Sequence, residues 1–99
     1  MLELAILGLL KEQELHGYEL KKRLTDALGA FSSVSFGSLY PALQRLEHSG
    51  LIESEWGSTE NNRRARFYSL TAAGRSALGY ETESWRRFAA AVEVVLRTS

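Results

Sequence analysis

The sequence predicts a mainly α-helical domain of the α+β class, in which three helices, a two-stranded hairpin and one long final helix follow one another. Two observations predict this order. Apolar residues recur every three to four positions along most of the chain, but they alternate with polar residues in two short stretches past its middle. The 99 residues, 44% hydrophobic and 24% charged with a single proline, also have the length and composition of one folded domain.

The first two helices are predicted in the first third of the chain. Leu2, Ile6 and Leu9 recur at helical spacing and form one apolar face. A second helix follows Gly17, with an apolar stripe opposite a charged face. We expect this helix to end at Gly29, which stands where a left-handed C-cap is common.

The third helix is predicted to begin after Ser35, because a serine hydroxyl can accept a free N–H of the first turn. Leu39, Leu43 and Leu46 then lie on one apolar face. Gly50 is expected to end the helix.

Two stretches of alternating residues, 52–56 and 66–70, predict an antiparallel hairpin joined by a polar loop over 57–64. Thr71 can cap a final helix that runs to about Arg97. Such a helix is roughly 39 Å long, which is more than a core of this size can cover. The order of the elements is that of a winged helix-turn-helix with a long C-terminal helix.

Several classes of function are excluded by what the sequence lacks. It contains no cysteine for disulfides or thiolate zinc sites, and His16 and His48 are too far apart for a metal motif. Ser38 does not stand in a nucleophile motif, and we expect no catalysis, metal or cofactor. No apolar run reaches the ~18–20 residues of a membrane span, which predicts a cytoplasmic protein.

The formal net charge is zero, so a nucleic-acid partner would have to be attracted by local charge. The hairpin loop supplies such a charge, since it and the strand that follows contain three arginines and one acid. Guanidinium groups bind phosphate in a bidentate manner, which favours a basic wing on DNA. A solvated hairpin tip is the alternative. The arginines are Arg63, Arg64 and Arg66.

The exposed face of the third helix combines hydroxyl, phenol, amide and guanidinium groups, a mixture that groove readout uses. An ordinary polar helix face is the alternative. The predicted DNA-binding residues of this helix are Ser35, Ser38, Tyr40, Gln44 and Arg45, and Lys21, Lys22 and Arg23 of the second helix are expected to add phosphate contacts.

The final helix carries a heptad series of apolar residues that Glu81 interrupts. This series favours pairing with a second copy of the chain, and packing within one chain is the alternative. One tryptophan of the series is a candidate platform for a flat ligand, although dimer packing is the favoured explanation for it. The predicted dimer residues are Leu78, Trp85, Phe88, Val92 and Val95, with Trp85 the predicted effector contact.

Five segments make the sequence familiar: HGYEL at 16–20, SFGSLYPAL at 35–43, RLE at 45–47, GLI at 50–52 and YSLTAAG at 68–74. With these segments the chain resembles the PadR family of bacterial transcriptional regulators over essentially its whole length. The resemblance implies a winged-helix DNA-binding domain that acts as a dimeric repressor. Because it has one C-terminal helix, the chain is similar to the short branch of the family, which includes repressors that sense multidrug-like compounds.

The resemblance also implies roles for individual residues. It places Tyr18, Ser35, Ser38, Tyr40 and Pro41 in the DNA-facing helix-turn-helix, and the three arginines in the wing. It places Trp85 where drug-sensing relatives carry a tryptophan that stacks on flat guests.

These observations predict a homodimeric repressor that binds a pseudo-palindromic operator in double-stranded DNA. Residues 1–70 are expected to form the DNA-binding part and residues 71–99 the dimerisation helix, within one folding unit. A planar hydrophobic effector bound between the final helices is expected to release the DNA. The alternative from another class is a winged-helix module that binds protein and not DNA; an enzyme is the poorest option.

Overall fold

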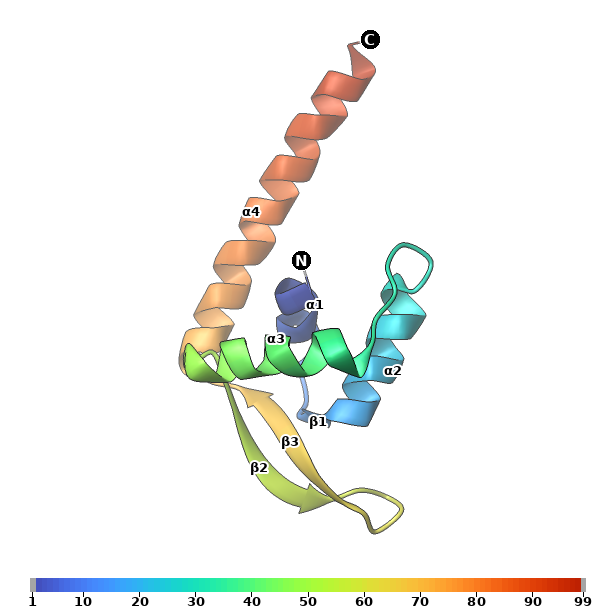
Figure 1. Cartoon of the computed structure of the whole chain (residues 1–99). Coiled ribbons are helices and arrows are strands. Elements are labelled where there is room, and N and C mark those ends of the chain that lie inside the picture. The colour runs from blue at the N-terminus through green and yellow to red at the C-terminus, as the bar shows by residue number, and fades with distance from the viewer. Residues whose placement is uncertain (1, 99) are drawn as a thin grey trace.

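The computed structural model describes residues 2–98, which form a winged helix-turn-helix with a long final helix (Figure 1). The mainly helical α+β fold and the order of its larger elements are as predicted. The elements are α1 (Leu2–Leu9), β1 (Leu15–His16), α2 (Gly17–Leu28), α3 (Phe36–His48), β2 (Ile52–Ser58), β3 (Arg64–Leu70) and α4 (Ala72–Arg97).

The core lies where the first three helices meet the base of the hairpin. Leu39, Leu43 and Leu46 are buried there, as the predicted apolar face of α3 requires. The hairpin closes the core with Ile52 and Leu70, which pair across β2 and β3. The largest fully buried side chains are Ile6, Leu10, Leu20, Leu24, Leu39, Leu43 and Ile52.

Both ends of α3 are fixed by local hydrogen bonds. Ser35 is the N-cap, and it forms a capping box with Ser38, in which each side chain bonds the backbone N–H of the other residue. At the other end Gly50 has a φ of +76°, and its N–H and that of Leu51 bond carbonyls of the last helical turn. This is a Schellman arrangement, which orients the chain directly into β2.

The hairpin differs from the prediction in two ways: its loop is shorter, and a third strand, β1, pairs with it. The strands reach Ser58 and Arg64, so the loop covers only residues 59–63 and not 57–64. Asn62 takes a left-handed φ of 58° that makes this shorter loop feasible. The sheet order is β1-β3-β2, and β1 was not predicted because two residues are too few to show alternation.

The expected left-handed cap at Gly29 is wrong. Its φ of −59° and ψ of −27° are right-handed, and its N–H continues the helical pattern to the carbonyl of Thr25. Two further N–H groups, of Phe31 and Ser32, bond the carbonyl of Leu28. The helix end is therefore satisfied by a tightened last turn, so no left-handed residue is needed.

Helix α4 is attached tightly at its start and exposed along the rest of its length. The Thr71 hydroxyl caps it by accepting the N–H of Gly74, and donates to the carbonyl of Gly50 at 2.6 Å. Gly74 is buried against the chain that joins α3 to β2, where a Cβ would overlap the carbonyl oxygen of Leu51. Beyond Leu78, which packs against the core, the helix projects away from the hairpin (Figure 1).

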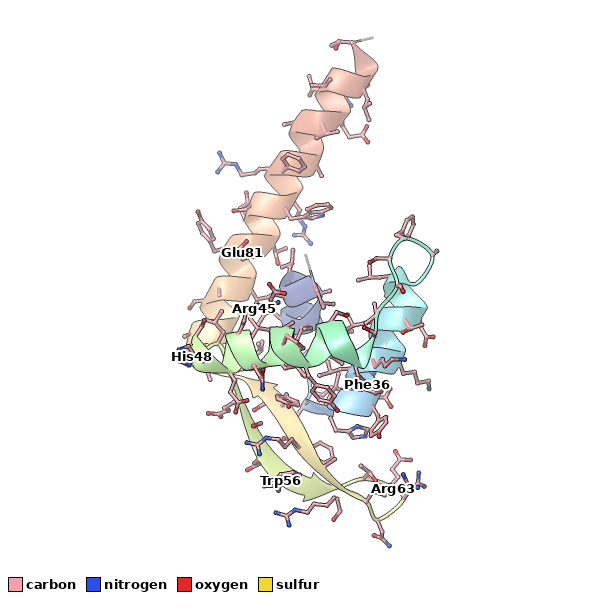
Figure 2. All side chains as sticks on the ribbon, in the orientation of Figure 1. Phe36, Arg45, His48, Trp56, Arg63 and Glu81 are labelled. Atoms are coloured by element: carbon pink, nitrogen blue, oxygen red, sulfur yellow. The ribbon has the colours of Figure 1, made fainter. Side chains whose placement is uncertain are left out.

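The projecting part of α4 exposes apolar side chains of the predicted heptad series. Trp85 is 47% exposed, Phe88 63% and Val95 67%, and Val92 is also exposed. Glu81, which interrupts the series, lies on the same projecting part (Figure 2). Neither α4 nor any other helix in residues 2–98 is apolar enough over its length to span a membrane.

Candidate nucleic-acid interface

A groove of about 300 Å³ lies between α2, α3 and the hairpin. We call it the wing groove. Its walls come from the start of α2, the early turns of α3 and the outer half of the hairpin, three segments that are distant in the sequence. Its lining residues are Gly17, Tyr18, Tyr40, Trp56, Arg64, Ala65, Arg66 and Tyr68.

The helical wall of the groove is aromatic. Tyr18 meets Phe36 edge to face with ring centroids 5.2 Å apart, and Phe36 stacks on Tyr40 at 5.4 Å. The ammonium of Lys21 lies 5.2 Å from the Phe36 ring centroid. Tyr40 can approach α2 closely because position 17 is a glycine, whose added Cβ would lie 2.9 Å from the phenol oxygen. These contacts place one cation and three rings on a single surface.

The hairpin wall of the groove is cationic. The register of β2 and β3 places Arg66 directly opposite Trp56, on the same face as Arg64. The guanidinium carbon of Arg64 lies 4.5 Å from the Trp56 ring centroid, and that of Arg66 lies 5.1 Å from it. Cation–π contact of this kind holds a guanidinium flat while its edges stay open to a ligand. Arg63 is exposed at the end of the loop (Figure 2).

A chain of hydrogen bonds connects this wall to α3. The Arg66 Nε–H donates to the Ser54 hydroxyl at 3.1 Å, and that hydroxyl donates to Glu47 Oε2 at 2.8 Å. Glu47 lies in the last turn of α3, and Ser54 lies in β2. The wing is thereby joined to α3 by side chains as well as by the backbone.

The phenol of Tyr68 lies beneath the groove in this electrostatic setting. Burial raises the pKa of Tyr68, and the nearby Glu47 carboxylate raises it further. Arg66 acts in the opposite direction, and Tyr40 adds a smaller upward effect. Tyr68 therefore lines the groove as a neutral phenol over a wider pH range than an ordinary tyrosine would.

The structure brings together only part of the predicted DNA-binding set. Tyr18, Tyr40, Arg64 and Arg66 line the wing groove. Arg45 does not: its guanidinium bonds Glu3 of α1 at 3.2 Å, on the side of α3 away from the hairpin (Figure 2).

The other predicted residues of α3 lie outside the groove but remain exposed. Ser35 and Ser38 are exposed, with hydroxyls engaged in the capping box. Pro41 and Gln44 lie on the outer face of the helix. Of the expected phosphate contacts on α2, Arg23 pairs with Glu19 at 3.1 Å.

Phe36, Glu47, Ser54 and Trp56 belong to the site and were missed as site residues. The alternation of 52–56 placed Trp56 beside Ile52 on one strand face, yet the tryptophan is 55% exposed. Its pairing with two arginines depends on the hairpin register, which the loop length sets and the pattern does not. Within residues 2–98 no three His, Asp or Glu side chains converge as a metal site would need.

Comparison with known proteins gives a consistent result. The chain matches the model of the PadR-like family of transcriptional regulators over residues 6–80. The negative transcriptional regulator PadR of Bacillus subtilis is 33% identical over 79% of this chain, which spans 43% of that relative.

Solved structures agree with the sequence match. A PadR-like transcriptional regulator of Bacillus cereus is 32% identical with a TM-score of 0.86, covering 96% of this chain and 90% of its own. The B. subtilis PadR bound to operator DNA is 32% identical with a TM-score of 0.73, covering 83% of this chain and 46% of its own. With the winged helix and this family match over most of its length, the chain belongs to the PadR-like family, whose members are transcriptional regulators and not enzymes.

Proposed function

We propose that the chain is a homodimeric repressor that binds double-stranded DNA with α3 in the major groove and the hairpin on the adjacent phosphate backbone. One observation carries the proposal: Arg64 and Arg66 stack on one ring of the wing and face the aromatic start of α3 across the wing groove. In a chain with a net charge of zero, these two cations lie together where a duplex would touch a winged helix. The operator DNA in the complex of the B. subtilis relative supports the same partner.

Helix α3 has suitable groups for the proposed groove contact. Its outer face presents Pro41 and Gln44, whose amide can both donate to and accept from a base edge. Its N-terminus carries Ser35 and Ser38, close to the free N–H groups that favour phosphate. Tyr40 is 43% exposed and directs its ring toward the start of α2.

Two copies of the chain would pair through α4. The exposed series Trp85, Phe88, Val92 and Val95 is an apolar stripe that one chain leaves uncovered. Pairing would place two α3 helices in successive major grooves about 34–36 Å apart, on a pseudo-palindromic site. Repression is supported by the relative in B. subtilis that is named a negative regulator.

The proposal predicts that reversing the wing charges abolishes DNA binding. We expect Arg63→Glu with Arg64→Glu to lose the wild-type complex, because carboxylates that repel the phosphates replace the guanidinium groups that attract them. Each lost phosphate contact should also make the salt dependence of the binding constant shallower by about 0.9 log units per decade of salt. The probe is a duplex that the wild-type protein selects from a random pool, titrated across a salt series. The control is Arg87→Glu with Arg97→Glu, the same change of charge on exposed positions of α4. Unchanged binding by the wing variant would remove the wing from the mechanism.

An effector site at Trp85 extends the proposal. Trp85 is half-exposed and lies next to Phe88, with ring centroids 6.4 Å apart, so two copies would place a pair of such rings together. A planar hydrophobic molecule could stack there and rotate the two DNA-binding parts. The test is Trp85 fluorescence in a Trp56→Phe background against flat aromatic cations; an unchanged spectrum across the panel contradicts the site.

A further inference from the structure

The hydrogen-bond chain from Glu47 through Ser54 to Arg66 uses only one of the arginine's donors. A guanidinium has five N–H groups, and the Nε–H of Arg66 is the one that Ser54 accepts. The four N–H groups of its terminal nitrogens have no hydrogen-bond partner within residues 2–98. They form the fork that fits two phosphate oxygens.

The contrast with Arg45 shows what this arrangement achieves. Arg45 uses a terminal nitrogen to bond the carboxylate of Glu3 directly, so one of the two nitrogens of its fork is engaged by an acid. Arg66 is oriented by a carboxylate too, but the Ser54 hydroxyl stands between them and takes the bond at the other end of the guanidinium. Glu47 therefore helps to orient Arg66 and leaves its terminal N–H groups available to a phosphate.

The Trp56 ring restrains the same guanidinium from a second direction. It lies 5.1 Å from the guanidinium carbon, while the Ser54 hydroxyl bonds Nε. Two restraints on one planar group reduce the side-chain entropy that an exposed arginine loses when it binds. Because Glu47 lies in α3, the hydrogen-bond chain from Glu47 to Arg66 also sets the position of the Arg66 fork relative to α3.

We propose that Glu47 and Ser54 are positioning residues for DNA binding, which hold the Arg66 fork open toward a phosphate that flanks the groove occupied by α3. This inference rests on the proposed function. It assigns DNA-binding roles to an acid and a serine that would not be expected to touch the duplex.

The test uses the full-length protein and the duplex it selects from a random pool. Ser54→Ala is expected to weaken binding about tenfold, the scale of one hydrogen bond to a charged group. In an Arg66→Ala background Ser54→Ala should have no further effect, because the serine acts only through that arginine. Ser69→Ala, on the other face of the hairpin, is the matched control and should bind as the wild type does.

The role of the Glu47 carboxylate is tested by two variants that carry the same charge as each other. Glu47→Gln keeps an oxygen that accepts the Ser54 hydroxyl, and should bind within about threefold of wild type. Glu47→Leu removes the acceptor and should weaken binding about as much as Ser54→Ala. Since both lose the same charge, any difference between them reports the hydrogen bond.

The outcomes separate the inference from the proposed function. If the wild-type protein selects no duplex, the proposed function fails and the inference fails with it. If the wild type binds and Ser54→Ala binds equally well, or weakens binding as much without Arg66 as with it, the inference alone is overturned. Equal binding by Glu47→Gln and Glu47→Leu would also overturn it.

Discussion

At the scale of residues, the positive charge of the candidate nucleic-acid interface comes from the position of a few arginines and not from a basic composition. Acidic and basic residues are equal in number, yet Arg64 and Arg66 lie on one strand face over the same tryptophan. Arg23 and Arg45, by contrast, are paired with the acids Glu19 and Glu3. A neutral protein can therefore present a cationic surface on one side.

The buried phenol of Tyr68 gives a prediction about pH. Its pKa is raised above the ordinary value of 10.0, so folding favours the protonated form. Its contribution to the free energy of unfolding is complete below that value and is lost as the pH rises through the higher pKa of the folded state. We expect Tyr68→Phe to reduce the loss of stability above pH ~10, measured by chemical denaturation over a pH series. A variant that loses stability as steeply as the wild type contradicts this account.

Which residues could be predicted depended on whether their role follows from position along the chain. Arg64 and Arg66 stand in or next to a short polar stretch, and Tyr40 stands on a helix face that the apolar period defines; all three line the wing groove. Trp56 is assigned its place in the site by Arg66, which lies opposite it on β3. Ser54 is assigned its place by hydrogen bonds to Arg66 of β3 and Glu47 of α3. Arg45 has the right residue type, but its partner Glu3 is 42 residues away, a contact that no local pattern reveals.

At the scale of elements, the larger helices and the hairpin could be predicted from the spacing of apolar residues. Each is long enough for that spacing to repeat several times. Strand β1 has only two residues, and its place beside β3 depends on tertiary packing. The end of α2 was mispredicted for a related reason: glycine permits a left-handed cap but does not require one.

The close contact between Gly74 of α4 and the segment that joins α3 to β2 gives a prediction about stability, with Gly79 as the comparison. Gly74→Ala should lower the free energy of unfolding by about 1–3 kcal/mol, because its Cβ meets backbone that cannot move aside freely. Gly79→Ala, on the same helix with open space around the new Cβ, should raise it by about 1 kcal/mol. Thermal and chemical unfolding measure both, and a stabilised Gly74 variant would show that the contact is loose.

At the scale of the whole molecule, the chain is elongated, with extents of 55 × 30 × 21 Å, because α4 extends past the core. The hairpin and the free part of α4 lie at opposite ends (Figure 1). Since the close contact at Gly74 ties the start of α4 to the end of α3, a rotation of α4 would be transmitted to the DNA-binding part. This shape would keep the proposed DNA-binding surface apart from the proposed dimer surface.

The exposed stripe on α4 predicts how the proposed dimer can be disrupted. Phe88→Glu should shift the protein from dimer to monomer, because the apolar contact would otherwise bury an unpaired charge. Ala90→Glu, an exposed position outside the series, adds the same charge and should leave the dimer intact. Sedimentation measures the mass of each, and a Phe88 variant that remains dimeric would place the interface elsewhere.

The most direct test of the central claim is a footprint of the purified protein on DNA from upstream of its own coding region, with random duplex as control and a salt series. We predict two symmetric protected half-sites about 34–36 Å apart, bound selectively and weakening steeply with salt. A single half-site without a symmetric partner contradicts binding by a symmetric dimer. Equally weak binding to both duplexes contradicts sequence-specific binding at this DNA and favours a winged helix that serves a protein partner.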